Sequence, residues 1–193
     1  MQQYLYPMSS LIAFKSFIRK IGDCDGISGV SGTLTATSFG KILDFFNLAL
    51  MDVFLDIGAG VCHALFYATD RAPGIKSYGI ENDPIKLIKA RAALEKFNNN
   101  NSMTLIEANI EELPQLPNNT THVYIACEGM PPTTIEAIMK LIDACKTVKK
   151  TVFVARHGQG FECDNMALVQ KIPVTLQGGG TRLQAYCYEL NNI

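Results

Sequence analysis

The sequence predicts a doubly wound α/β domain, with a seven-stranded, mostly parallel sheet between helices and an antiparallel hairpin at its C-terminal end. Short apolar runs alternate with helical patterns between residues 51 and 155, and parallel strands require crossover connections of this kind. A glycine turn follows the first apolar run, as at the ligand-binding edge of such sheets. Residues 174–177 and 183–190 flank a run of glycines near the end of the chain, which is typical of a hairpin.

The composition fits one globular domain. The chain has 193 residues, of which 48% are hydrophobic and 18% charged, and this length suits a single core. The formal net charge of -1 gives no overall basic field, so a nucleic-acid partner would need a local basic patch. The six cysteines lack metal-binding spacing, and no metal site is predicted. Because no apolar segment is long enough for a membrane span or a signal peptide, we expect a cytoplasmic or nuclear protein.

Residues 1–32 are predicted to form an N-terminal extension with a glycine-rich loop, and residues 33–193 the main domain. Residues 22–32 contain four glycines among Ser and Asp residues, a composition that favours a loop. The main domain then opens with a helix that Thr37 or Ser38 can cap. Its apolar residues recur at helical spacing: Phe39, Ile42, Leu43, Phe46 and Leu50.

The strands of the main domain are short apolar runs that end at polar or glycine-rich turns. They are expected at residues 51–57, 77–81, 103–108, 122–126 and 151–155. Helices are expected between them, at about 61–69, after the capping residue Asp83, and after Pro131-Pro132. A further short helix is expected at 164–170, just before the hairpin.

Two strand ends carry residues that suit a nucleotide-like ligand. Asp56-x-Gly58-x-Gly60 follows the first strand, and glycines there let the backbone approach a ligand closely. Glu81 ends the second strand, where a carboxylate can accept hydrogen bonds from both hydroxyls of an adenosine ribose. His63 stands where a dinucleotide motif needs its third glycine, whereas Asp56 suits a ligand with an ammonium group. The alternative is a non-enzymatic α/β domain in which the two carboxylates only cap helices.

Two segments resemble the cofactor motifs of a known superfamily. Val53-Phe54-Leu55-Asp56-Ile57-Gly58-Ala59-Gly60 and Tyr78-Gly79-Ile80-Glu81 are similar to the first two motifs of Rossmann-like class I methyltransferases. Together with Gly32-Thr33-Leu34-Thr35, they most resemble the disruptor-of-telomeric-silencing (Dot-one) histone lysine methyltransferases. The chain departs from that subfamily at Thr33, where a glutamate is usual, at Cys62, where a glycine is usual, and at 126–130, where Asn-Asn-x-x-Phe is usual.

This resemblance implies an S-adenosyl-L-methionine-dependent methyltransferase and a set of site residues. Asn109, after the third strand, occupies the place that contacts the adenine amino group, although it also suits a simple turn. Glu128, in the loop after the fourth strand, is the candidate catalytic residue, which would orient or deprotonate a substrate amine. The cofactor-binding candidates are Thr35, Asp56, Gly58, Ala59, Gly60, Glu81, Asn82 and Asn109.

The expected methyl acceptor is a protein lysine. RNA or a small molecule is the alternative within enzymes, and a non-catalytic subunit that binds S-adenosylmethionine is the alternative from another class. The unfamiliar loop after the fourth strand and the nearly neutral charge motivate that last alternative. The residue pattern leaves the oligomeric state open.

Overall fold

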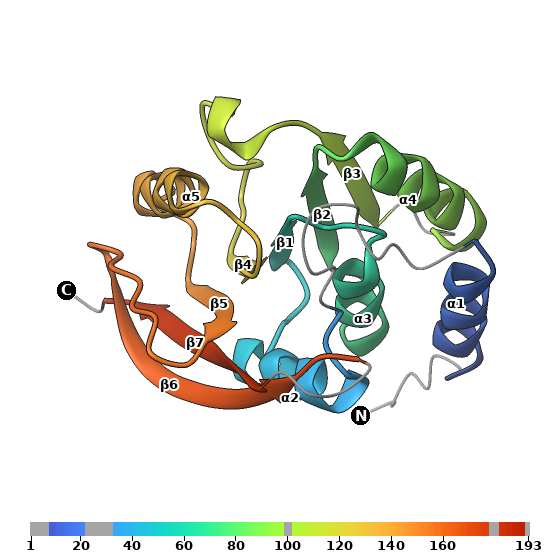
Figure 1. The fold of residues 1–193 in the computed structure, drawn as a ribbon, viewed down its shortest axis with the longest axis horizontal. Helices are drawn as coiled ribbons and strands as arrows, with labels where there is room; N and C mark the ends of the chain where they lie inside the picture. Colours follow the sequence, from blue (N-terminus) through green and yellow to red (C-terminus); the bar gives the residue numbers. More distant parts are fainter. Residues whose placement is uncertain (1–7, 22–32, 99–101, 178–181, 192–193) are drawn as a thin grey trace.

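The computed structural model describes residues 8–21, 33–98, 102–177 and 182–191. These residues form a seven-stranded sheet and the helices around it (Figure 1). The strands lie in the order β3-β2-β1-β4-β5-β7-β6. β1 to β5 are parallel, whereas β7 is antiparallel to both β5 and β6. The predicted sheet with its antiparallel C-terminal pair is therefore confirmed. The strands are β1 (Val53–Ile57), β2 (Lys76–Glu81), β3 (Met103–Glu107), β4 (His122–Ala126), β5 (Lys150–Arg156), β6 (Met166–Thr175) and β7 (Arg182–Leu190).

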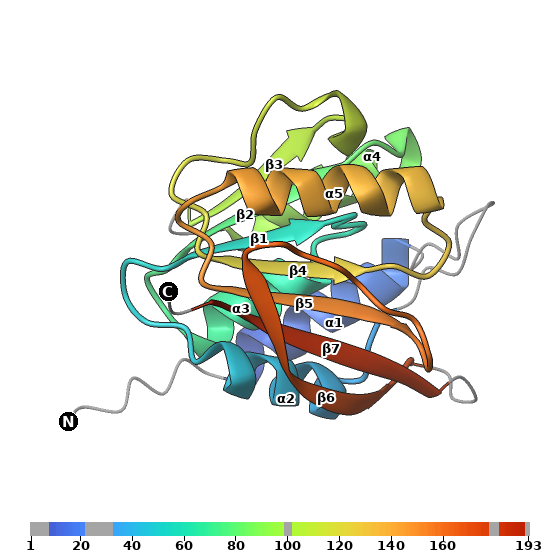
Figure 2. The ribbon, with the colours of Figure 1, turned by 90° about the vertical axis from the view of Figure 1, so that its left-hand side faces the viewer.

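Helices cover both faces of the sheet, as Figures 1 and 2 show. α2, α3 and α4 pack on one face, and α5 packs on the other with the short 3-10 helix η1. α1 lies farther out, against α3 and α4. The helices are α1 (Met8–Ile21), α2 (Ala36–Phe46), α3 (His63–Arg71), α4 (Pro84–Phe97), η1 (Ile110–Glu112) and α5 (Pro132–Ala144).

Side chains along β1 alternate between the two faces of the sheet, because successive residues of a strand point in opposite directions. Phe54 belongs to the core beneath α2 and α3, whereas Leu55 and Ile57 belong to the core beneath α5. Asp56, the next-to-last residue of β1, therefore lies on the α2 and α3 face. That face of the sheet carries the candidate site.

The N-terminal helix α1 shares the core of the rest of the chain. Phe14 is fully buried and stacks on Phe66 of α3, with 3.9 Å between ring centroids, and its edge meets Phe97 of α4. Ile18 is buried one turn later. Aromatic burial of this kind contributes strongly to packing. The proposed domain division at residue 32 falls in 22–32, which lies outside the described residues.

Three local predictions are wrong. The helix α2 ends at Phe46, so Leu50, which was predicted on its apolar face, lies beyond the helix and is 72% exposed. Residues 164–170 do not form a helix, because β6 begins at Met166 and pairs along its length with β7, apart from a register shift between Leu168 and Gln170. The helix α2 is capped by Thr35, whose Oγ1 accepts a hydrogen bond from the Ser38 backbone amide at 3.2 Å, and not by Thr37 or Ser38. The glycines of the predicted hairpin turn, 178–180, lie outside the described residues.

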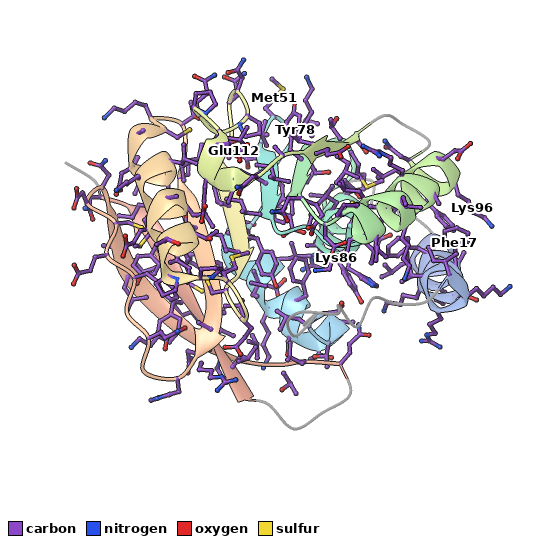
Figure 3. All side chains as sticks on the ribbon, turned by 45° about the horizontal axis from the view of Figure 1, so that its top comes forward. Phe17, Met51, Tyr78, Lys86, Lys96 and Glu112 are labelled. Carbon is purple, nitrogen blue, oxygen red and sulfur yellow. The ribbon has the colours of Figure 1, made fainter. Side chains whose placement is uncertain are left out.

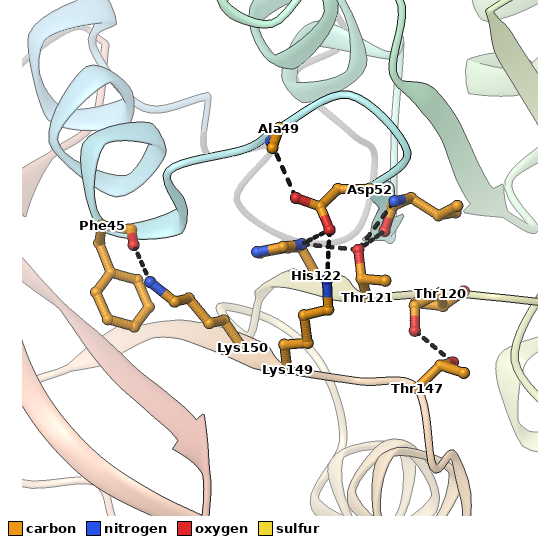
Figure 4. Close-up of polar contacts among 10 residues, drawn as sticks. Phe45, Ala49, Asp52, Thr120, Thr121, His122, Thr147, Lys149 and Lys150 are labelled. Atoms are coloured by element: carbon orange, nitrogen blue, oxygen red, sulfur yellow. Dashed lines mark hydrogen bonds and ion pairs between the residues drawn. The ribbon is translucent and has the colours of Figure 1, made fainter.

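A buried polar cluster holds the amino ends of β1, β4 and β5 together (Figure 4). Asp52 accepts hydrogen bonds from Lys149 Nζ and from the Ala49 backbone amide, both at 2.9 Å. Burial raises its pKa, but the bonds from Lys149 and Ala49 and the charges nearby outweigh burial, so the net pKa is lowered. Burial lowers the pKa of the neighbouring His122 to about 4, which keeps its ring neutral at pH 7. Asp52 is therefore an ionised anchor of the fold, at the opposite ends of the strands from the glycine turn.

Candidate active site

A cavity of about 470 Å³ opens at the carboxyl ends of β1, β2 and β4. This is the edge at which doubly wound sheets bind ligands, and the volume is within the range of small-molecule sites. The sequence-predicted residues that line it are Asp56, Gly58, Ala59, Gly60, Glu81, Asn82, Asn109 and Glu128. The fold therefore brings together side chains from four separate segments of the chain.

The turn between β1 and α3 has a backbone that requires glycine. Gly58 and Gly60 have positive φ angles of 79° and 54°, a region that side chains with a Cβ rarely adopt. The amides of Gly58 and Ala59 both donate to the Ile80 carbonyl at 2.9 Å, which ties the turn to β2. A Cβ at Gly58 would also lie 2.8 Å from the methyl group of Met130. The turn is thus compact, and Met130 closes over it.

Glu81 anchors this turn through its carboxylate. The oxygens accept hydrogen bonds from three backbone amides: Gly60 at 2.7 Å, and Asn82 and Asp83 at 2.9 Å each. A carboxylate offers roughly four acceptor positions, so about one stays open to a ligand hydroxyl. Glu81 therefore faces the cavity and also holds the glycine turn that forms part of the cavity wall. The sequence pattern did not reveal this second, structural role.

Asp56 is the exception among the carboxylates of the site. Its side chain is 3% exposed and lines the cavity, and no other described residue donates a hydrogen bond to it. Burial, and then the negative charge of Glu81, raise its pKa to about 8. A buried carboxylate without a donor is costly unless a cation or a proton neutralises it. The site therefore favours a ligand that carries a positive charge at this point.

The two asparagine candidates both line the cavity. Asn109 caps η1, because its Oδ1 accepts from the Glu111 amide at 3.2 Å and its Nδ2 donates to Glu112 Oε1 at 3.4 Å. Asn82 is exposed, and its backbone amide is held by Glu81. Asn109 thus forms the turn that was the alternative to an adenine contact. Its position still faces the cavity.

Thr35, a predicted cofactor-binding residue, is not among the residues that line the cavity. Its hydroxyl caps α2 and donates to the Ser38 hydroxyl at 2.9 Å, so the side chain is committed to the helix start. Thr33 and Leu34, directly before it, line the cavity instead.

Glu128 lines the cavity and forms an ion pair that the sequence did not reveal. Arg156 Nε, from the end of β5, donates to Glu128 Oε2 at 3.1 Å. The Glu128 side chain is 14% exposed and that of Arg156 is 71% exposed, so the guanidinium covers the carboxylate from the solvent side. Tyr186 holds the backbone there, because its hydroxyl donates to the Arg156 carbonyl at 3.0 Å. Glu128 is therefore oriented at the cavity, with Oε1 left without a partner among the described residues.

Lys86 and Tyr124 are among the lining residues that the sequence analysis missed. Lys86 lies in the first turn of α4, just after the capping Asp83 (Figure 3). Tyr124 lies on β4, two residues before its end, and strand periodicity places it on the same face as Ala126. In the sequence, the alternation of side chains along β4 was the one signal that could have placed Tyr124 on the cavity face. Its position beside Asp56 could not be predicted, because it follows from the parallel pairing of β1 and β4.

Other chemistries find little support in the described part of the chain. No group of three or more His, Cys, Asp or Glu side chains there is placed to hold a metal ion. Burial, and then the charge of Glu128, raise the pKa of the Cys127 thiol to about 12, which keeps it protonated and poorly nucleophilic. None of the described helices has the length and apolar character needed to cross a membrane.

Comparison with known proteins finds solved structures of the same fold. TrmN from Thermus thermophilus superposes with a TM-score of 0.69 at 15% identity, over 83% of this chain and 50% of that one. TrmK from M. capricolum, solved with S-adenosylhomocysteine, gives 0.61 at 12% identity, over 82% and 70%. An RNA methyltransferase from Salinibacter ruber, also with S-adenosylhomocysteine, gives 0.58 at 16% identity, over 83% and 95%.

These similarities establish the fold, and the chain spans half the length of TrmN. No family model matches the chain, and no curated protein is similar to it in sequence. The three structures named above have the fold that the resemblance seen in the sequence implies, but they give no support to its Dot-one part.

Proposed function

We propose that this protein is an S-adenosyl-L-methionine-dependent methyltransferase whose cofactor lies in the cavity at the ends of β1, β2 and β4. The observation that carries the proposal is Asp56, a buried carboxylate that lines the cavity without a donor. The amino-acid end of S-adenosylmethionine supplies an ammonium group, which is the partner that Asp56 lacks. Solved structures with this fold contain S-adenosylhomocysteine, which has the same amino-acid end.

The rest of the cavity fits the remaining parts of this cofactor. The open acceptor position of Glu81 suits a ribose hydroxyl, and Asn109 borders the place expected for the adenine. Apart from its chain neighbours, no atom of the described residues lies within 4 Å of the place where a Cβ of Gly60 would be, so a ligand can approach the backbone there, whereas Met130 covers Gly58. When bound, the cofactor supplies an electrophilic methyl group.

The loop after β4 would receive the methyl acceptor. Glu128 Oε1 can accept a hydrogen bond from an acceptor N–H, while Arg156 fixes the carboxylate through Oε2. Met130 and Pro131, from the same loop, also line the cavity and give it apolar surface there. Since methyl transfer depends mainly on alignment of the nucleophile, this orientation carries much of the rate. We infer an amino group as the acceptor.

That amino group belongs to a protein lysine or to an RNA base. The sequence resemblance to Dot-one enzymes favours the lysine. The Salinibacter ruber structure, an RNA methyltransferase of the same fold, favours RNA. A small-molecule amine and a non-catalytic cofactor-binding subunit are the remaining outcomes of the test.

The test is transfer of radiolabelled methyl from S-adenosylmethionine into a cell extract, which is then separated into protein, RNA and small-molecule fractions. Label in one fraction that vanishes with Asp56→Ala supports the proposal and names the acceptor class. In the same assay, Glu128→Gln should lower turnover and leave cofactor affinity nearly unchanged. Wild-type protein that binds neither S-adenosylmethionine nor S-adenosylhomocysteine in calorimetry would refute the proposal, and binding without transfer would favour the non-catalytic subunit.

A further inference from the structure

Tyr124 is a further polar residue that lines the cavity. The residue is 5% exposed, and its hydroxyl forms no hydrogen bond with another described residue. Unlike the hydroxyl of Tyr67, its hydroxyl is not among the fully buried, unpartnered atoms, so it remains accessible from the cavity. Tyr124 is therefore placed to bind a ligand group.

Tyr124 stands directly beside Asp56. The two residues are paired in the register of β4 and β1, and paired residues of parallel strands point to the same face. Neighbouring strands lie about 4.8 Å apart, so the two side chains start from backbones at that spacing. The cavity thus presents a carboxylate and a phenol side by side, and neither has a hydrogen-bond partner among the described residues.

The surroundings of Tyr124 fix its ring and keep its proton. Phe39 of α2 meets the ring edge to face, with 5.0 Å between centroids, which limits its rotation. Burial, and then the charges of Asp56 and Cys127, raise the pKa of Tyr124 well above its usual value. The phenol is therefore a hydrogen-bond donor throughout the physiological range of pH.

We propose that Asp56 and Tyr124 form a two-point clamp for the amino-acid end of the bound cofactor. Asp56 accepts hydrogen bonds from the ammonium group, and the Tyr124 hydroxyl donates one to the carboxylate. Both ligand groups are attached to the same carbon atom, so an acceptor and a donor on adjacent strands match their separation. This inference rests on the proposed function and adds a cofactor-positioning residue to it.

The experiment compares two ligands by calorimetry: S-adenosylhomocysteine, and 5′-methylthioadenosine, which lacks the amino-acid end. Tyr124→Phe removes one oxygen atom and keeps the ring. It should weaken S-adenosylhomocysteine binding about tenfold or more, the loss expected for one hydrogen bond to a charged group. It should leave 5′-methylthioadenosine binding within about twofold of wild type, because that ligand has no group for the phenol to bind.

Tyr78→Phe is the matched control. Tyr78 is a half-buried tyrosine of β2 (Figure 3), it packs toward the α5 core, and it does not line the cavity. This variant should leave both affinities unchanged. Unchanged binding of S-adenosylhomocysteine by Tyr124→Phe, or an equal loss for both ligands, would overturn the clamp. Wild-type protein that binds neither ligand would instead refute the proposed function, and the clamp with it.

Discussion

Asp56 should make the binding of S-adenosylhomocysteine depend on pH. Burial, and then the charge of Glu81, raise its pKa to about 8 in the ligand-free protein, and only the ionised carboxylate pairs with the ammonium of the ligand. For a pKa near 8, about 1% of the group is ionised at pH 6.0 and about a quarter at pH 7.5. Because the apparent dissociation constant varies inversely with the competent fraction, affinity should rise roughly 20- to 30-fold between these pH values.

The assay is calorimetric titration at pH 6.0, 6.5, 7.0 and 7.5, where the ligand amine stays largely protonated. Binding at pH 6.5 should release close to one proton, measured by repeating the titration in buffers of different ionisation enthalpy. Asp56→Asn should bind more weakly at pH 7.5 and show no comparable slope. A constant wild-type affinity across this range, or an equal slope in Asp56→Asn, would refute the assignment of the titrating group.

Three further variants test the scaffold. In Glu81→Gln, the side-chain amide cannot accept hydrogen bonds from all three backbone amides that now hold the glycine turn. The affinity for S-adenosylhomocysteine in calorimetry should therefore fall about tenfold or more. An unchanged affinity would remove Glu81 from the site. Lys149→Ala removes an ion pair from the buried Asp52 and should lower the free energy of unfolding in urea by about 1 kcal/mol at pH 7, since Lys149 itself is largely exposed. Phe14→Ala removes a fully buried aromatic ring and should lower the free energy of unfolding in the same assay by about 3 to 5 kcal/mol. A decrease below about 1 kcal/mol would mean that α1 does not share the core.

The parallel strands could be predicted because their signals are local. β1 and β4 are short apolar runs bounded by turn residues, and the predicted range of β4 agrees with the structure. The start of α4 was equally clear, since Asp83 accepts from the amides of Ile85 and Lys86 and Pro84 follows it as predicted. Caps and apolar periods lie within a few residues of the features that they predict, so no tertiary information is needed.

The cap of α2 and the strand β6 depended on distant parts of the chain. Thr37 and Ser38 are as competent to cap a helix as Thr35, but the Ser38 hydroxyl accepts a hydrogen bond from the Thr175 amide of β6 at 2.9 Å. The Thr35 amide donates to the Thr175 carbonyl, also at 2.9 Å. Residues 166–170 are compatible with a helix by themselves, and pairing with β7 decides that they form a strand.

The sequence by itself determined that Asp56 and Glu81 end neighbouring strands beside a glycine turn, because strand periodicity and glycine chemistry are local properties. Only the tertiary structure decided what each carboxylate does there. Glu81 is held by three backbone amides, whereas Asp56 has no donor among the described residues and lies beside Tyr124. These differences arise from pairings between segments 20 to 70 residues apart, which bring the strand ends together and set the burial and charge around each group.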